Sequence, residues 1–145
     1  MLYKPLVLCL QVFRLASTAS IGLTSEASEG QRVSLINVPD YYEKLFTSYP
    51  EIQLRTRGAV ELIHFFTKSQ KELLLMLPKL KKRIVQNGMI WVSWPKKSSK
   101  VETDIIEDTI RNYAIEIGLV DVKVCAVDEI WSGLKLVILL KFRKT

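Results

Sequence analysis

From residue 32 onward, strand-like and helix-like segments alternate, and this alternation constrains the fold more than any other feature of the sequence. Apolar runs rich in β-branched residues, over residues 32–38 and 60–67, are typical of buried strands. Between them, residues 40–49 have helical spacing with Asp40 as an N-cap, and residues 52–58 suit a short strand. The pattern predicts an α/β domain.

The next helix has the clearest start signal. Ser69 followed three residues later by Glu72 has the spacing of a capping box. Asn87 and Gly88 predict the end of this helix, and Pro78 predicts a kink or a division within it. An apolar stripe that would face a sheet consists of Leu73, Leu77, Leu80 and Ile84.

The following strand and helix are predicted from the same kinds of signal, an apolar pattern and helix-terminating residues. The run "MIWVSW", residues 89–94, is too apolar to face water on either side, which is expected of a central strand. Asp104 and Glu107 then predict a second capping box, and Gly118 predicts the end of the helix. Its inward stripe would be formed by Ile106, Ile110, Tyr113 or Ala114, and Ile117.

Two alternating strands complete the chain. One apolar face is predicted in the first from Val120, Val122, Val124 and Ala126, and one in the second from Leu134, Leu136, Ile138, Leu140 and Phe142. The six residues "DEIWSG" between them suit a hairpin. The predicted fold is a three-layer, Rossmann-like α/β domain, whose mostly parallel sheet is closed by a C-terminal antiparallel hairpin.

The N-terminal segment precedes the predicted α/β domain. Residues 1–29 are predicted to be an arm or a signal-like segment, and residues 30–145 a single α/β domain. The apolar run before Arg14 is far shorter than the roughly 20 residues that a membrane-spanning helix requires. We expect a cytoplasmic protein, or an exported one if residues 1–19 act as a signal.

The composition limits the classes of ligand and metal site that we expect for this chain. The chain of 145 residues has 21 Lys and Arg against 15 Asp and Glu, a net charge of +6, which favours anionic partners such as phosphate, nucleotides or nucleic acid. The only cysteines are Cys9 and Cys125 and the only histidine is His64, so neither a disulfide framework nor a His/Cys metal cluster is expected. Cys125 and His64 both lie in strand-like segments, where packing is favoured over nucleophilic catalysis. No metal and no cofactor is predicted.

The C-terminal half, with its helix, central strand opened by Gly88, second helix and final hairpin, resembles the end of the S-adenosylmethionine-dependent methyltransferase fold. In that fold a glycine-rich turn follows the first strand, because the cofactor approaches the backbone closely. Here the turn is "NVPDYY", which contains no glycine, and no acidic residue clearly ends a second strand, although Glu51 lies nearby in the sequence. These departures argue against the usual mode of cofactor binding.

The strings "NGMIWVSWPKKSS", "GQRVSLINVPDYYEKL" and "TDIIEDTIRNYAIEIGLVDVKVCAVDEIWSGLKLVI" resemble a bacterial family known as domain of unknown function 3052. The resemblance covers residues 30–138 and implies a small cytoplasmic protein without assigned activity. It supplies no catalytic residues. This chain departs from the family before the first strand, where "LASTASIGLTSEASEG" replaces the expected short stretch.

The best candidate site is the loop "WPKKSSK", which joins the central strand to a helix start. Ligands of open α/β sheets bind at the carboxyl ends of the strands, and helix N-termini favour anions. The alternative is a mobile polar loop whose charges lie in water, and the alternative for "DEIWSG" is that Trp131 packs over the sheet end and Gly133 serves the turn. The candidate ligand-binding residues are Trp94, Lys96, Lys97, Ser98 and Ser99, with Asn37 and Asp40 after the first strand and Asp128, Trp131 and Ser132 in the hairpin.

The sequence favours a non-catalytic or degenerate methyltransferase-like module that binds an anionic ligand or partner at the strand-end crevice. One alternative is an S-adenosylmethionine-dependent transferase with an altered cofactor turn. A second alternative is nucleic-acid association through the basic helix, residues 79–83, and the C-terminal "KFRK". That helix lacks the interleaved aromatic residues that stack bases in single-strand binders.

Overall fold

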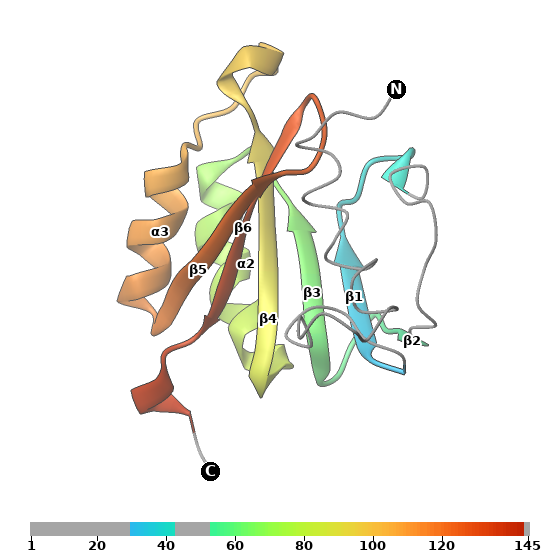
Figure 1. Ribbon diagram of the computed structural model, residues 1–145, viewed down its shortest axis with the longest axis vertical. Helices are drawn as coiled ribbons and strands as arrows, with labels where there is room; N and C mark the ends of the chain where they lie inside the picture. Colours follow the sequence, from blue (N-terminus) through green and yellow to red (C-terminus); the bar gives the residue numbers. More distant parts are fainter. Residues whose placement is uncertain (1–29, 43–52, 144–145) are drawn as a thin grey trace.

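The computed structural model describes residues 30–42 and 53–143, which form one six-stranded sheet with two α-helices (Figure 1). The strand order is β2-β1-β3-β4-β6-β5. The strands are β1 Arg32–Ile36, β2 Gln53–Leu54, β3 Val60–Phe66, β4 Ile84–Pro95, β5 Leu119–Ala126 and β6 Trp131–Ile138. The helices are α2 Gln70–Arg83 and α3 Glu107–Glu116, with short 3-10 turns η2 Lys97–Ser99 and η3 Leu140–Phe142.

The sheet has the predicted mixture of directions. Strand β1 pairs in parallel with β2 and β3, and β3 pairs in parallel with β4. Strand β6 is antiparallel to both β4 and β5. The α/β, Rossmann-like fold with a C-terminal antiparallel hairpin is therefore confirmed. Because β2 and β3 lie on opposite sides of β1, the order of the strands reverses between β1 and β3, which creates a topological switch point.

Both helices pack on the same face of the sheet; in Figure 1, α2 lies behind the sheet and α3 lies at the left, beside β5. Leu73, Leu77 and Leu80 of α2 and Ile110 and Ala114 of α3 join one core cluster with the sheet, as their spacing predicts. A second cluster, with Phe66, Trp91 and Trp131, covers the other face. The predicted helix over residues 40–49 and the predicted arm over residues 1–29 lie outside the described residues, apart from Asp40 to Tyr42 at the start of that helix. None of the described helices is long and apolar enough to cross a membrane.

The start of α2 uses different partners from those predicted. Ser69 is the N-cap and accepts the Glu72 backbone N–H at 3.3 Å, as expected. The Glu72 carboxylate does not return to the Ser69 backbone, because it contacts Thr67 and Asn37 instead. Asp104 was predicted to cap α3, but its Oδ1 accepts the Gln70 N–H of α2 at 2.7 Å. Asp104 therefore ties the loop after β4 to the preceding helix.

The boundaries around Pro78 also differ. Helix α2 passes through Pro78 without being divided and ends at Arg83. Ile84 begins β4 at once, so Asn87 and Gly88 lie within a strand and do not terminate the helix. A Cβ on Gly88 would lie 3.0 Å from the Glu61 backbone oxygen, so the glycine permits a close approach of β4 to β3.

Five apolar residues predicted to lie on inward faces are exposed to solvent. Ile106 precedes α3 and is 53% exposed. Val122 and Val124 of the edge strand β5 are about equally exposed, because a register shift between Asp121 and Lys123 breaks the alternation. Strand β6 ends at Ile138, so the predicted continuation through Leu140 and Phe142 is wrong, and both are exposed in η3.

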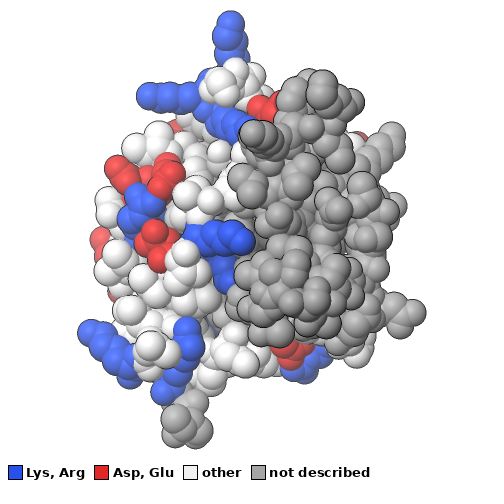
Figure 2. Space-filling model, viewed as in Figure 1, with Lys and Arg blue, Asp and Glu red and all other residues white. Residues whose placement is uncertain are grey.

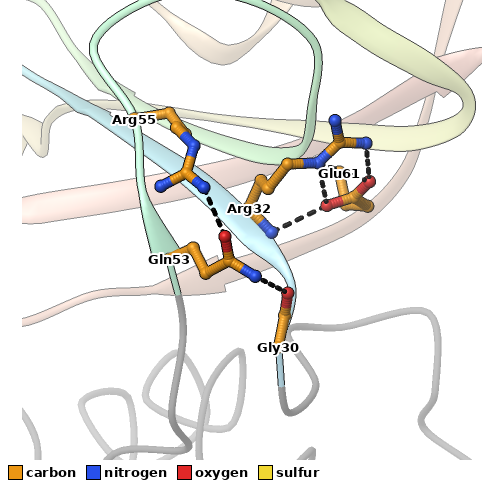
Figure 3. A network of polar contacts seen from close by, with 5 residues as sticks. All are labelled: Gly30, Arg32, Gln53, Arg55 and Glu61. Atoms are coloured by element: carbon orange, nitrogen blue, oxygen red, sulfur yellow. Dashed lines mark hydrogen bonds and ion pairs between the residues drawn. The ribbon is translucent and has the colours of Figure 1, made fainter.

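At the amino ends of the parallel strands, polar contacts join β1 to β3 and join the short strand β2 to the residue before β1 (Figure 3). Arg32 forms an ion pair with Glu61, whose Oε1 also accepts the Arg32 backbone N–H at 2.7 Å. Gln53 Nε2 donates to the Gly30 carbonyl at 3.1 Å, and Arg55 donates to Gln53. These contacts lie at the edge of the sheet opposite the carboxyl ends of β1, β3 and β4.

Candidate functional site

A hollow of about 580 Å³ lies between the end of β4 and the start of α3. It brings together four of the predicted site residues, Trp94, Lys96, Lys97 and Ser132. The remainder of its lining consists of Pro95, Thr103, Ile105, Ile106, Glu107 and Asp108. The hollow lies at the carboxyl end of a parallel strand, where ligands of this sheet architecture bind.

The loop that carries the lysines has a fixed backbone. The Lys96 N–H donates to the Ile130 carbonyl at 2.7 Å, which joins the loop to the β5–β6 hairpin. The Lys96 carbonyl accepts the Ser99 N–H at 3.1 Å and the Ser99 hydroxyl at 2.6 Å. Ser99 is thus engaged in its own turn, while Ser98 is exposed and outside the lining of the hollow. Lys and Arg side chains project at this η2 end of the molecule in Figure 2.

The opposite wall is anchored to α2 and the end of β3. Thr103 Oγ1 donates to the Lys68 carbonyl at 2.7 Å and accepts the Ile105 N–H at 3.1 Å. Asp104 adds its contact with Gln70, and Ile105 is only 2% exposed. The loop between η2 and α3 is therefore tied at successive residues, so the hollow is built on backbone that packing and hydrogen bonds hold in place.

The two lysines of the hollow have no ionic partner among the described residues, whereas its two carboxylates share one. Glu107 and Asp108 both pair with Arg111, which also bonds Asp121 at 3.0 Å. Hydrogen bonds to Glu107, first, and to Asp121 raise the pKa of Arg111. Within the described part of the chain, Lys96 and Lys97 form no ion pair. The Ile106 N-cap of α3 provides no side-chain acceptor, so the first N–H groups of this helix are not capped from there.

Asn37 and Asp40 lie at the switch point and outside the lining of this hollow. Asn37 has φ 58°, a left-handed conformation that favours glycine and tolerates asparagine. Its Nδ2 donates to Glu72 Oε2 at 3.1 Å, and Thr67 Oγ1 donates to Glu72 Oε1 at 2.5 Å. We call these three side chains the Glu72 clasp. The clasp connects the turn after β1 to the helix after β3.

The hairpin residues divide between two roles. Asp128 Oδ1 accepts the N–H groups of Ile130 and Trp131, both at 2.7 Å, so its carboxylate shapes the turn. Trp131 is 7% exposed and donates from Nε1 to Tyr41 Oη at 3.1 Å. Burial, together with Asp128, raises the pKa of Tyr41 to about 12. Of the predicted hairpin residues, Ser132 alone lines the hollow.

A buried polar chain was missed by sequence reasoning. Tyr42 Oη lies 2.8 Å from His64 Nδ1, and His64 Nε2 lies 2.8 Å from Ser93 Oγ. All three residues are at most 3% exposed, and burial lowers the pKa of His64 to about 3. The signal was a histidine within an otherwise apolar strand, but nothing in the sequence identified its partners.

Cys125 lies on β5, three strand positions from β3, a separation of about 14 Å from the region of His64. The two residues do not form a nucleophile–base pair, which agrees with the packing role predicted for them. Among the described residues there is no group of three or more His, Cys, Asp and Glu side chains that could hold a metal ion.

Comparison with known proteins gives a clear result for the fold alone. No protein-family model matches the sequence, and no curated protein matches it. The resemblance to domain of unknown function 3052 therefore stays a prediction.

Several solved structures are similar in fold. A ribosomal protein L11 methylase from Lactobacillus delbrueckii subsp. bulgaricus has a TM-score of 0.53 and 13% identity, over 89% of this chain and 78% of that one. The magnesium protoporphyrin IX methyltransferase of Synechocystis PCC 6803, with bound SAH, has a TM-score of 0.53 and 11% identity, over 76% and 74%.

A TehB-like SAM-dependent methyltransferase from Corynebacterium glutamicum matches with a TM-score of 0.51 and 8% identity, over 77% of this chain and 82% of that one. At such identities the likeness concerns architecture and carries no assignment of activity. The chain has a methyltransferase-like, Rossmann-like fold.

Proposed function

We propose that this chain is a non-catalytic, methyltransferase-like module that binds an anionic small molecule in the hollow at the end of β4. One observation carries the proposal. Lys96 and Lys97, which have no ionic partner within the described residues, line the same hollow as Trp94 and Ser132. Two free ammonium groups beside a helix N-terminus without a side-chain cap favour an anion.

Three features support a role other than S-adenosylmethionine binding in its usual mode. The turn after β1 has Asn37 where the fold resemblance implies glycines, and the Glu72 clasp crosses the switch point beside it. Strand β2 ends at Leu54 and the next residue is Arg55, so no acidic residue directly follows the strand. Glu51 lies outside the described residues. These features leave no acidic side chain directly after β2 to hold the ribose, and no glycine in the turn after β1 to let the cofactor approach the protein backbone.

The alternative is an S-adenosylmethionine-dependent transferase with an altered cofactor turn. Its support is the left-handed conformation of Asn37, which keeps a glycine-like backbone at the turn. A protein of similar fold was solved with bound SAH. The alternative requires that the clasp open to admit the cofactor.

A thermal-shift screen separates the two functions, because a ligand that binds only the native state raises the melting temperature. The ligands are inorganic phosphate, adenosine monophosphate, S-adenosylmethionine and SAH. We expect stabilisation by the phosphate compounds, and its loss in the double variant Lys96→Ala/Lys97→Ala. The control is Lys71→Ala/Lys79→Ala, which removes the same charge from exposed positions of α2. Stabilisation by SAH alone would establish the transferase alternative.

We also propose, from the sequence resemblance, that the chain is a cytoplasmic bacterial protein of the family called domain of unknown function 3052. Expression of the full chain with a C-terminal tag, followed by cell fractionation and N-terminal sequencing, tests the location. An intact N-terminus in the cytoplasmic fraction is the expected result. Cleavage near residue 19 with recovery outside the cytoplasm would support export.

A further inference from the structure

The lining of the hollow includes apolar side chains that an inorganic anion would leave uncovered. Beside the two lysines it contains an apolar set formed by Trp94, Pro95, Ile105 and Ile106. Ile106 keeps 53% of its surface exposed although it is a large apolar side chain. A phosphate ion alone would leave this surface in water, whereas an organic ligand with a flat ring would cover it.

Trp94 adds a hydrogen-bond donor to this wall. Its side chain is 94% buried, being 6% exposed, and its indole N–H has no hydrogen-bond partner within the described residues. Among the residues that the structure describes, the fully buried polar side-chain atoms that lack a partner are Arg83 Nη2 and Trp91 Nε1, and Trp94 Nε1 is not among them. Trp94 lines the hollow, so its indole N–H is a donor that a ligand bound there can use.

Charge limits the anionic part of the ligand to a single phosphate. A phosphate monoester carries a charge of about −1.5 to −2 at neutral pH, which the two ammonium groups of Lys96 and Lys97 match. Glu107 and Asp108 also line the hollow, and their pairing with Arg111 neutralises them only in part because Arg111 serves Asp121 as well. A longer polyphosphate would bring further negative charge toward these carboxylates.

We propose that the hollow binds a phosphate monoester of a flat ring, of the size of a nucleoside monophosphate. The phosphate lies at Lys96 and Lys97, the ring covers Ile106, and an acceptor on the ring or sugar takes the Trp94 N–H. A hollow of about 580 Å³ falls in the range of small-molecule sites, roughly 300 to 1,000 Å³. This inference rests on the proposed anion-binding function and specifies its ligand class.

Isothermal titration calorimetry of the full chain with four probes tests the inference. The probes are adenosine monophosphate, adenosine, inorganic phosphate and adenosine triphosphate. We expect the monophosphate to bind at least about tenfold more tightly than each of the others. In Trp94→Phe, loss of one hydrogen bond should weaken the monophosphate by about fivefold and leave inorganic phosphate unchanged.

Ile106→Ala provides a second variant at an exposed position, which does not depend on repacking the core. It should weaken the monophosphate several-fold without affecting phosphate. Equal affinity for phosphate and the monophosphate, or preference for the triphosphate, would overturn the ligand class while leaving anion binding intact. Failure of all four probes, or binding unaffected by Lys96→Ala/Lys97→Ala, would overturn the proposed function as well.

Discussion

At the scale of single residues, the only histidine has the most unusual environment. His64 is buried between Tyr42 and Ser93, and each ring nitrogen has one hydroxyl partner at 2.8 Å. A neutral imidazole has one donor and one acceptor nitrogen, so it satisfies both hydroxyl groups without any charge. Protonation would place a positive charge in an apolar cluster, which is why burial lowers the pKa of His64 to about 3.

This pKa predicts how stability depends on pH. In the unfolded chain His64 has the ordinary pKa of 6.5, so below that pH the unfolded state binds a proton that the folded state does not. The contribution is present above pH 6.5 and is lost as the pH falls toward 3. Between pH 7.5 and 5 the free energy of unfolding should fall by about 2 kcal/mol, as measured by urea denaturation.

His64→Gln is the matched control, because the amide can bond both hydroxyl groups but does not titrate. The free energy of unfolding of this variant should not change over the same pH interval. Since the chain has one histidine, its imidazole C–H resonance can be followed directly by NMR. A resonance that titrates near pH 6.5 in the folded protein would contradict the buried, neutral state.

The Glu72 clasp gives a second residue-scale prediction. Glu72→Ala removes the acceptor shared by Asn37 Nδ2 and Thr67 Oγ1, and also an acidic group from the first turn of α2. We expect a loss of about 1 to 2 kcal/mol in the free energy of unfolding, measured by chemical denaturation. Glu116→Ala, at an exposed position at the end of α3, should change stability little. Equal effects of the two substitutions would show that the clasp contributes nothing.

At the scale of elements, helix α2 contains an internal proline, and a side chain of helix α3 supplies the hydrogen-bond donor that the proline lacks. Pro78 cannot supply the N–H that would bond the Leu74 carbonyl, four residues earlier. Tyr113 of α3 donates its hydroxyl to that carbonyl at 3.0 Å. The contact explains how an internal proline is tolerated between two packed helices.

A double-mutant cycle tests this compensation. Tyr113→Phe alone should lower the free energy of unfolding by about 1 kcal/mol, because the Leu74 carbonyl loses its donor. In a Pro78→Ala background the restored backbone N–H takes over, so the same substitution should cost much less. Calorimetric or urea-based stabilities of the four proteins provide the measurement. An identical cost in both backgrounds would mean that the tyrosine does not replace the missing donor.

The same helices show why element boundaries resisted prediction. The sequence located α2 and its cap Ser69, because those signals are local. It assigned Glu72 and Asp104 to local capping boxes, whereas both carboxylates bond partners more than thirty residues away, Asn37 and Gln70. Local spacing cannot distinguish a cap from a tertiary contact when the same residue type serves both.

At the scale of the whole molecule, the alternation of elements was sufficient to predict the fold class, because parallel strands with helical crossovers have few arrangements. It also placed Lys96 and Lys97 at the correct edge of the sheet, since the carboxyl ends of parallel strands share one edge. It could not foresee that Trp94 and Ser132 would line the same hollow while Asp128 and Trp131 turned to structural roles. That division depends on the register of β6 against β4, which brings Trp94 opposite Ser132.

The distribution of charge over the molecule bears on nucleic-acid association. The net charge is +6, but the basic run at the end of α2 is not fully available. Lys81 Nζ donates to the Ile117 carbonyl at 2.5 Å, and Arg83 bonds the Gly58 carbonyl and Ser34 Oγ. Lys79 and Lys82 are the exposed basic residues that remain on that part of the helix.

Two exposed lysines can release few counterions from a nucleic acid, and each phosphate contact adds about one unit to the salt dependence of binding. We therefore expect only non-specific affinity for duplex DNA, with a dissociation constant of about 10⁻⁴ M or weaker at physiological salt. Fluorescence anisotropy at several salt concentrations measures both quantities, and Lys79→Ala/Lys82→Ala should change neither substantially. Tight binding with a steep salt dependence that this variant abolishes would instead favour a nucleic-acid partner, because it would locate the contact on α2 and away from the hollow at the end of β4.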